Sequence, residues 1–130
     1  MAKTRATIAV VDDDAGVRTA LHQLVRSAGF DAIAFESAEA FLASAKQLDI
    51  QCLIADINLP GMSGVALAQT LAENGGPPHV VLITGRDDAH TLELIGRAGN
   101  VPLLRKPFSD RELFDAIDRG NVRDTRKDAS

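Results

Sequence analysis

The chain has 130 residues, of which 45% are hydrophobic and 25% charged, and its formal net charge is −4 at pH 7. This length and composition are typical of one globular domain, and the negative charge argues against a general nucleic-acid-binding surface. No apolar run approaches the roughly 20 residues that span a bilayer, and the polar start does not resemble a secretory signal, so we expect a cytoplasmic protein without a membrane contact.

The first predicted elements are two strands, each followed by a helix. Residues 8–11 form an apolar, β-branched run that predicts a buried strand, and apolar residues from 17 to 28 then recur at helical spacing. Asp14 suits the first turn of that helix, because the helix dipole favours negative charge there. Residues 31–35 predict a second strand, and Ser37 can cap the helix that follows it.

The same alternation continues to the end of the chain. The remaining strands are predicted at residues 53–55, 80–83 and 101–104, and the remaining helices begin after Ser63, after Asp88 and after Ser109. The lone Cys52 cannot form an internal disulfide and is expected to be a small core residue. Strands that alternate with helices predict a parallel sheet with right-handed crossovers and helices on both faces.

Polar side chains follow four of the predicted strands at their carboxyl ends. Three acids follow the first and third strands, a hydroxyl the fourth and an ammonium the fifth: Asp12, Asp13, Asp56, Thr84 and Lys106. In an open parallel α/β sheet, ligands bind outside the carboxyl ends of the strands. We therefore expect these side chains to form one site.

The chemistry of this group favours a divalent cation and a phosphoryl group. Two carboxylates about 4 Å apart repel by roughly 4 kcal/mol at an effective dielectric of 20, and a cation would offset that repulsion. A few carboxylate and carbonyl oxygens suit Mg²⁺, which is often shared with phosphate. An aspartate can also act as a nucleophile and form an aspartyl phosphate, whose oxygens Lys106 and Thr84 would neutralise and hydrogen-bond.

Four segments of the sequence resemble those of response regulator receiver domains of two-component signalling: Val10–Asp14, Ala55–Gly64, Ile83–Gly85 and Arg105–Phe108. The resemblance runs from about Ile8 to about Arg119. It implies a flavodoxin-like (βα)5 fold of the α/β class, with a five-stranded parallel sheet in the order 2-1-3-4-5 and helices on both faces. We expect residues 1–120 to form the receiver domain and residues 121–130 a flexible C-terminal tail.

The resemblance also implies a role for each residue of the site. Asp56 would be the phosphoacceptor, Lys106 would pair with the phosphoryl group, and Thr84 would be the switch hydroxyl that moves toward it. The implied ligands of Mg²⁺, for which Mn²⁺ could substitute, are Asp13, Asp56, the backbone carbonyl of Asn58 and, through water, Asp12.

The implied function is a phosphorylation-activated switch of a two-component phosphorelay. A sensor histidine kinase or a histidine phosphotransfer protein would donate the phosphoryl group, and a downstream protein would bind the face of the fourth helix, fifth strand and fifth helix. The domain is not an enzyme acting on metabolites, although it could catalyse its own phosphorylation from small phosphodonors and its own dephosphorylation. We expect no nucleic-acid binding by this chain alone.

The sequence departs from the receiver pattern near the lysine. Receivers usually carry Tyr or Phe at the position of Leu103 and Asp at the position of Pro102, so the usual coupling of the switch threonine to an aromatic ring is not implied. Asn58 and Arg86 stand two residues beyond the phosphoacceptor and the threonine, where receivers flank the path of attacking water. We expect these two to set the lifetime of the aspartyl phosphate.

Two other functions stay open at this point. A haloacid-dehalogenase-like phosphatase would fit Asp12 and Asp14 as its acid pair, although the chain has no cap insertion. A phosphorylation-independent protein-binding module on a receiver fold is favoured by Leu103 and disfavoured by the intact acids. The stretch Phe35–Leu42 resembles FixJ-type receivers, whose relatives often carry a C-terminal DNA-binding domain, so we expect a stand-alone receiver or the N-terminal piece of a longer regulator.

Overall fold

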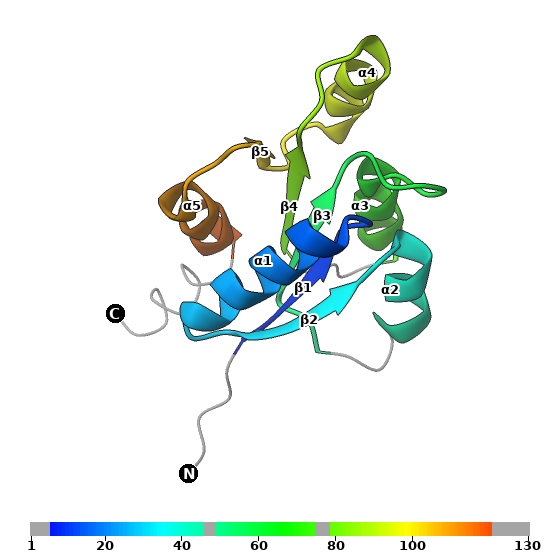
Figure 1. The fold of residues 1–130 in the computed structure, drawn as a ribbon. Helices are drawn as coiled ribbons and strands as arrows, with labels where there is room; N and C mark the ends of the chain where they lie inside the picture. The colour runs from blue at the N-terminus through cyan, green and yellow to red at the C-terminus, as the bar shows by residue number, and fades with distance from the viewer. Residues whose placement is uncertain (1–5, 46–48, 75–78, 121–130) are drawn as a thin grey trace.

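The computed structural model describes residues 6–45, 49–74 and 79–120, and in this part of the chain five parallel strands form one sheet (Figure 1). The strand order is β2-β1-β3-β4-β5, as the resemblance implies, and the flavodoxin-like fold is confirmed. The strands are β1 (Thr7–Val11), β2 (Asp31–Phe35), β3 (Cys52–Asp56), β4 (His79–Thr84) and β5 (Leu103–Arg105). The predicted tail at 121–130 lies outside the described residues.

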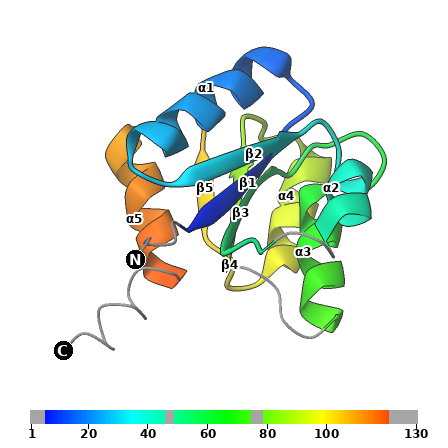
Figure 2. The ribbon, with the colours of Figure 1, turned by 90° about the horizontal axis from the view of Figure 1, so that it is seen from below.

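Helices cover both faces of the sheet, as Figure 2 shows. Two helices lie on one face, α1 (Ala15–Ser27) and α5 (Asp110–Gly120). The other face carries α2 (Ala38–Ala45), α3 (Gly64–Glu73) and α4 (Ala89–Ala98). Among the described residues, no helix combines the length and the apolar character needed to cross a membrane.

The alternation of side chains along the strands divides the buried residues into two cores. The α3-side core includes Ala9, Val11, Phe41, Leu53, Ala55, Val65, Leu67 and Leu82. The α1-side core includes Ile8, Val10, Leu21, Val25, Ile54, Ile83, Leu113 and Ile117. Cys52 belongs to the α1-side core, and burial raises the pKa of its thiol to about 12, so it is an inert core residue as predicted.

The helices begin at polar caps. The sequence predicts Ser63, Asp88 and Ser109 as caps, whereas it predicts Asp14 in the first turn of its helix rather than at the cap that it occupies. Asp14, Ser63 and Asp88 are the N-cap residues of α1, α3 and α4, and each side chain accepts a backbone N–H three residues further on. Ser109 and Glu112 form a reciprocal pair at the start of α5, because the backbone N–H of each donates to the side chain of the other.

Strand β5 begins later than predicted. The sequence suggests a strand at residues 101–104, whereas the ladder runs over Leu103–Arg105. Val101 N–H instead turns back to the carbonyl of Ala98 at 3.4 Å. Pro102 has no N–H to donate and only accepts, from Leu82 N–H at 2.9 Å, so regular pairing starts one residue after the proline.

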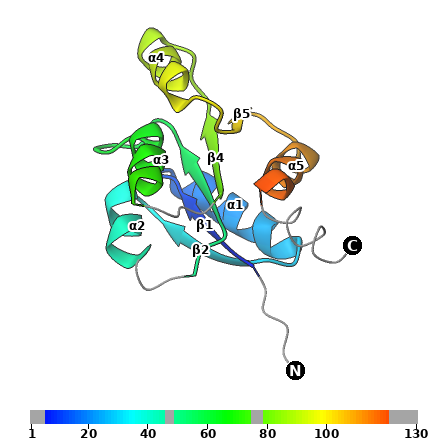
Figure 3. The same ribbon diagram turned by 180° about the vertical axis from the view of Figure 1, so that it is seen from behind.

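Helix α4 is held to the rest of the molecule by little buried surface. It lies beside α3 at the far end of the sheet from α2, next to the edge strand β5 (Figure 3). Of its residues, all of which the structure describes, Thr91 is the one that is buried. Leu94 and Ile95 are half-buried, and Leu92 is 49% exposed.

Candidate functional site

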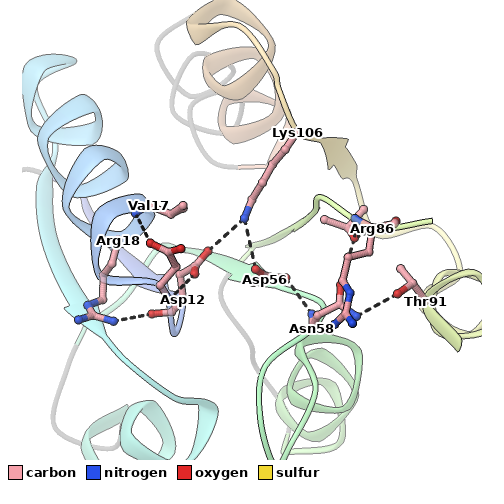
Figure 4. Close-up of polar contacts among 10 residues, drawn as sticks. Asp12, Val17, Arg18, Asp56, Asn58, Arg86, Thr91 and Lys106 are labelled. Atoms are coloured by element: carbon pink, nitrogen blue, oxygen red, sulfur yellow. Dashed lines mark hydrogen bonds and ion pairs between the residues drawn. The ribbon is translucent and has the colours of Figure 1, made fainter. Parts of the chain in front are cut away.

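The predicted side chains meet at the carboxyl edge of the sheet, as Figure 4 shows for Asp12, Asp56 and Lys106. Asp56 and Thr84 are the last residues of β3 and β4. Asp12 and Lys106 directly follow β1 and β5. Four neighbouring strands of one parallel sheet therefore deliver the acids, the hydroxyl and the ammonium to the same place.

The three acids form a tight group of carboxylates. Asp12, Asp13 and Asp56 each offer an oxygen atom, and these atoms lie within 4.8 Å of one another. Asp12 is 0% exposed and Asp56 is 7% exposed, whereas Asp13 lies at the surface. One acid of the group is thus open to solvent while the other two are enclosed by the fold.

Asp12 has a buried carboxylate oxygen that accepts no hydrogen bond among the described residues. Its Oδ1 accepts the N–H of Asp14 at 2.9 Å, but among the described residues its buried Oδ2 has no hydrogen-bond partner. Burial raises the pKa of the Asp12 carboxyl, the hydrogen bond from Asp14 opposes this rise, and the charge of Asp56 adds to it. An unsatisfied buried carboxylate oxygen facing other acids fits a hard divalent cation that coordinates oxygen.

The ammonium of Lys106 reaches between the two enclosed acids. Its Nζ lies 3.4 Å from Asp56 Oδ2 and 3.7 Å from Asp12 Oδ2, with 28% of the side chain exposed. The backbone N–H of Lys106 donates to the carbonyl of Thr84 at 2.8 Å, which fixes the residue at the end of β4. The bond from Lys106 to Pro107 is a cis peptide bond.

The two oxygens of Asp56 face different partners. Oδ2 faces Lys106, whereas Oδ1 accepts the backbone N–H of Asn58 at 2.8 Å. The N–H of Ile57 donates to the carbonyl of Ile83 at 2.8 Å and extends the β3–β4 pairing past the strand end. The carboxylate is therefore oriented by one backbone donor and one ammonium.

Thr84 is 1% exposed, and its hydroxyl contacts the loop that follows β4. It accepts the N–H of Arg86 at 3.1 Å and lies 3.2 Å from Asn58 Oδ1 and 3.3 Å from the carbonyl of Arg86. A hydroxyl has one hydrogen, so these two acceptors compete for it. The amide of Asn58 also donates to Thr91 Oγ1 at 2.9 Å, which joins the site to α4 (Figure 4).

Arg86 stands at the rim of the site. Its Nε lies 3.6 Å from Asp88 Oδ2, and both side chains are more than half exposed, so this ion pair adds little stability. Arg86 also lines an open cleft of about 350 Å³, together with Asp13, Asn58 and His90. The cleft thus lies beside one acid of the cluster and along the loop that follows Asp56.

The structure also shows the positions of Leu103 and Asp14, two further residues considered in the sequence analysis. Leu103 is half-buried and packs against the α3-side core, the same side as Leu94 of α4. Asp14 caps α1 by accepting Val17 N–H at 3.1 Å, and this use of its side chain argues against Asp14 as the second acid of a phosphatase pair.

Three residues that shape the site were missed from the sequence. Arg18 donates to the carbonyl of Asp12 at 2.7 Å, and Thr91 receives the amide of Asn58. Glu39 accepts the N–H of Met62 at 3.0 Å and so ties α2 to the loop after β3. The contact of Glu39 and that of Thr91 join residues more than 20 positions apart, so helical periodicity carries no signal for either.

Comparison with known proteins gives a consistent match. The family model of the response regulator receiver domain matches residues 8–118. Nodulation protein W of Bradyrhizobium diazoefficiens is 36% identical over 126 residues, which cover 97% of this chain and 56% of that protein. Transcriptional regulatory protein FixJ of the same organism is 34% identical over 115 residues, covering 88% of this chain and 56% of that protein.

A solved structure agrees with these sequence relatives. The crystal structure of FixJ-N superposes with a TM-score of 0.79 at 34% identity, covering 91% of this chain and 94% of that one. The chain spans about half the length of the curated relatives it matches.

Proposed function

This chain belongs to the response regulator receiver family of two-component signalling, and from that premise we propose that it is a switch activated by phosphorylation of Asp56. The resemblance to FixJ-type receivers is also confirmed. The observation that carries the proposal is the pairing of the buried Asp56 with Lys106, whose Oδ2 and Nζ lie 3.4 Å apart beside two further acids.

The proposed reaction needs positioning and charge more than covalent machinery. An oxygen of Asp56 attacks the phosphorus of a phosphohistidine on a sensor kinase or phosphotransfer protein. The O–P bond forms as the N–P bond breaks, and the released imidazole keeps the electron pair and takes a proton from solvent. Lys106 lies where it can neutralise an oxygen of the transferred group, and the Asn58 N–H already orients the carboxylate.

The donor set supports a metal ion in this reaction. Asp12, Asp13, Asp56 and the backbone carbonyl of Asn58 would hold Mg²⁺, or Mn²⁺ in its place. The buried Oδ2 of Asp12, which accepts no hydrogen bond among the described residues, supports that assignment. Bound there, the ion would supply the positive charge that offsets the acid cluster and the incoming phosphoryl oxygens. We propose Arg86 and the side chain of Asn58, which line the open cleft, as the groups that set the lifetime of the phosphorylated state.

The proposed output surface is the face of α4, β5 and α5. Leu92 of α4 is the one large hydrophobic side chain that is exposed among the described residues, which supports a partner-binding role for this helix. We propose residues 1–120 as the receiver domain. Its role is that of a signalling module, in which any catalysis acts on its own phosphorylation and dephosphorylation.

Intact mass spectrometry tests the proposed function. We expect incubation with Mg²⁺ and acetyl phosphate to add one phosphoryl group, and the same treatment with EDTA to add none. Asp56→Asn is the matched control, because it keeps the shape of the side chain and removes the nucleophilic carboxylate. Failure of several phosphodonors to modify the wild-type protein would favour a phosphorylation-independent binding module, for which Leu103 in place of an aromatic ring is the supporting feature.

A further inference from the structure

Two hydrogen bonds of the Asn58 side chain connect the site to α4. Asn58 Oδ1 faces the Thr84 hydroxyl at 3.2 Å, and Asn58 Nδ2 donates to Thr91 Oγ1 at 2.9 Å (Figure 4). Thr91 is 0% exposed and is the one buried residue of α4. The apolar side chains of this helix are at most half-buried. The first turn of α4 is thus anchored by a polar contact rather than by a large apolar side chain.

The Asn58 amide has one donating end and one accepting end, and the two ends face different elements. The Thr91 N–H donates to Asp88 Oδ1 at 2.8 Å, so the backbone of Thr91 is held by the N-cap of α4. Thr91 Oγ1 is the acceptor of the hydrogen bond from Asn58 Nδ2. The Asn58 amide presents its NH₂ to α4 and its oxygen to the Thr84 hydroxyl, for whose hydrogen Asn58 Oδ1 competes with the carbonyl of Arg86.

We propose that Thr91 is a positioning residue that, through Asn58, couples the hydrogen bond of the Thr84 hydroxyl to the anchoring of α4. The inference rests on the proposed function. The Thr84 hydroxyl has one hydrogen and cannot donate it to Asn58 and to a phosphoryl oxygen on Asp56 at once. When the phosphoryl group takes this hydrogen, Asn58 loses its donor, its amide is free to turn, and α4 loses the contact that anchors its first turn.

This route makes no use of an aromatic ring in β5. Leu103 has no hydroxyl and packs among the apolar residues of the α3-side core, so it offers Thr84 no polar partner. Asn58 instead connects the end of β3 to both the end of β4 and the start of α4 with its one side chain. The coupling is a competition for one hydrogen atom. Its effect falls on α4, which has fewer buried residues than any other described helix.

Two substitutions of Thr91 separate this role from packing. Thr91→Val keeps the shape and removes the hydroxyl, whereas Thr91→Ser keeps the hydroxyl and removes a methyl group. A residue that only packs would tolerate valine better than serine, and a residue that positions Asn58 would show the reverse order. Asp88→Ala is the third variant, since it weakens the cap of α4 without removing the acceptor of the Asn58 amide.

Hydrogen exchange of the backbone amides of residues 89–98 is the readout, measured in resting protein and after acetyl phosphate with Mg²⁺. In the wild type and Thr91→Ser, we expect these amides to exchange severalfold faster after phosphorylation. In Thr91→Val, we expect about tenfold faster exchange already at rest and no further response, because a buried hydrogen bond has been lost. Asp88→Ala is expected to raise exchange in both states and keep the difference between them.

The outcomes distinguish this inference from the proposed function. If Asp56 is phosphorylated and Thr91→Val responds as the wild type does, the coupling through Thr91 is overturned and the phosphorylation switch stands. A serine variant that loses the response while valine keeps it would assign Thr91 to packing. If the wild type takes up no phosphoryl group, the proposed function fails. The unphosphorylated proteins still test whether the Thr91 hydroxyl anchors α4, because equal exchange in Thr91→Val and the wild type would show that it does not.

Discussion

Asp12→Asn should make the metal-free protein more stable than the wild type, by about 1–2 kcal/mol at pH 7. The Asp12 carboxylate is fully enclosed and has oxygens of two acids, Asp13 and Asp56, within 4.8 Å, a separation at which each pair of charges repels by roughly 3.5 kcal/mol at an effective dielectric of 20. Loss of the attraction to Lys106 Nζ, 3.7 Å away and worth roughly 4.5 kcal/mol on the same scale, offsets part of the summed repulsion from the two acids. Asparagine keeps the acceptor that the Asp14 N–H uses.

Urea unfolding in EDTA measures this effect, and its pH dependence identifies the cause. Because the folded-state pKa of Asp12 is raised above 3.8, neutral Asp12 favours folding at low pH, and this stabilisation is lost as pH rises through the folded-state pKa. The advantage of Asp12→Asn should therefore shrink as pH falls from 7 toward 4.

Added Mg²⁺ should reverse the order of stability or narrow the difference between the two proteins. Added Mg²⁺ should stabilise the wild type more than Asp12→Asn, because a ligand that binds the folded state alone adds to its stability. Asp14→Asn is the matched control: it makes the same chemical change two residues along and retains a good N-cap, so it should alter stability little. An asparagine variant at position 12 less stable than the wild type in EDTA would show that the attraction to Lys106 dominates.

Gly64→Ala should damage both stability and phosphorylation. A methyl group at Gly64, the first residue of α3, would collide with the backbone oxygen of Asp56 and come within 3.1 Å of Ile57 Cα. Backbone atoms cannot turn aside as a flexible side chain can, so the end of β3 must shift. We expect a loss of about 2–3 kcal/mol in the free energy of unfolding. The phosphorylation rate should fall more than about tenfold, since reaction rates depend steeply on the placement of the nucleophile.

Gly96→Ala is the control for this substitution. Gly96 lies inside α4, and an added methyl group there would have no neighbour within 4 Å. Alanine should therefore stabilise the helix by about 0.5–1 kcal/mol without slowing phosphorylation. Urea unfolding and the rate of mass gain from acetyl phosphate measure both variants. A Gly64→Ala protein with wild-type stability and rate would mean that the close backbone approach is not what demands glycine.

The strands and their polar ends could be predicted because each follows from a local pattern. An apolar run that stops at an acid, a hydroxyl or a lysine predicts both the strand and the edge where its side chain lies, which places Asp12, Asp56, Thr84 and Lys106. The start of β5 could not be placed, because the missing N–H of Pro102 outweighs an apolar run that continues through it.

Contacts between distant segments could not be predicted. The place of Asn58 in the loop is readable from the sequence, but the direction of its side chain depends on Thr91, 33 residues further on. A threonine at a buried helix position looks like any tolerated polar residue until its neighbours are known. Glu39 is likewise an ordinary acid in the first turn of α2 until the loop at Met62 comes within reach of it.

The division of the interior into two cores has a consequence for how the surface can diversify. Neighbouring residues of one strand, such as Leu103 and Leu104, pack on opposite sides of the sheet. Substitutions in the core beneath α3 and α4 therefore need not disturb the side chains beneath α1 and α5, because the backbone of the sheet lies between the two cores. Under selection, one flank can acquire new binding specificity while the opposite flank, and any protein that recognises it, stays unchanged.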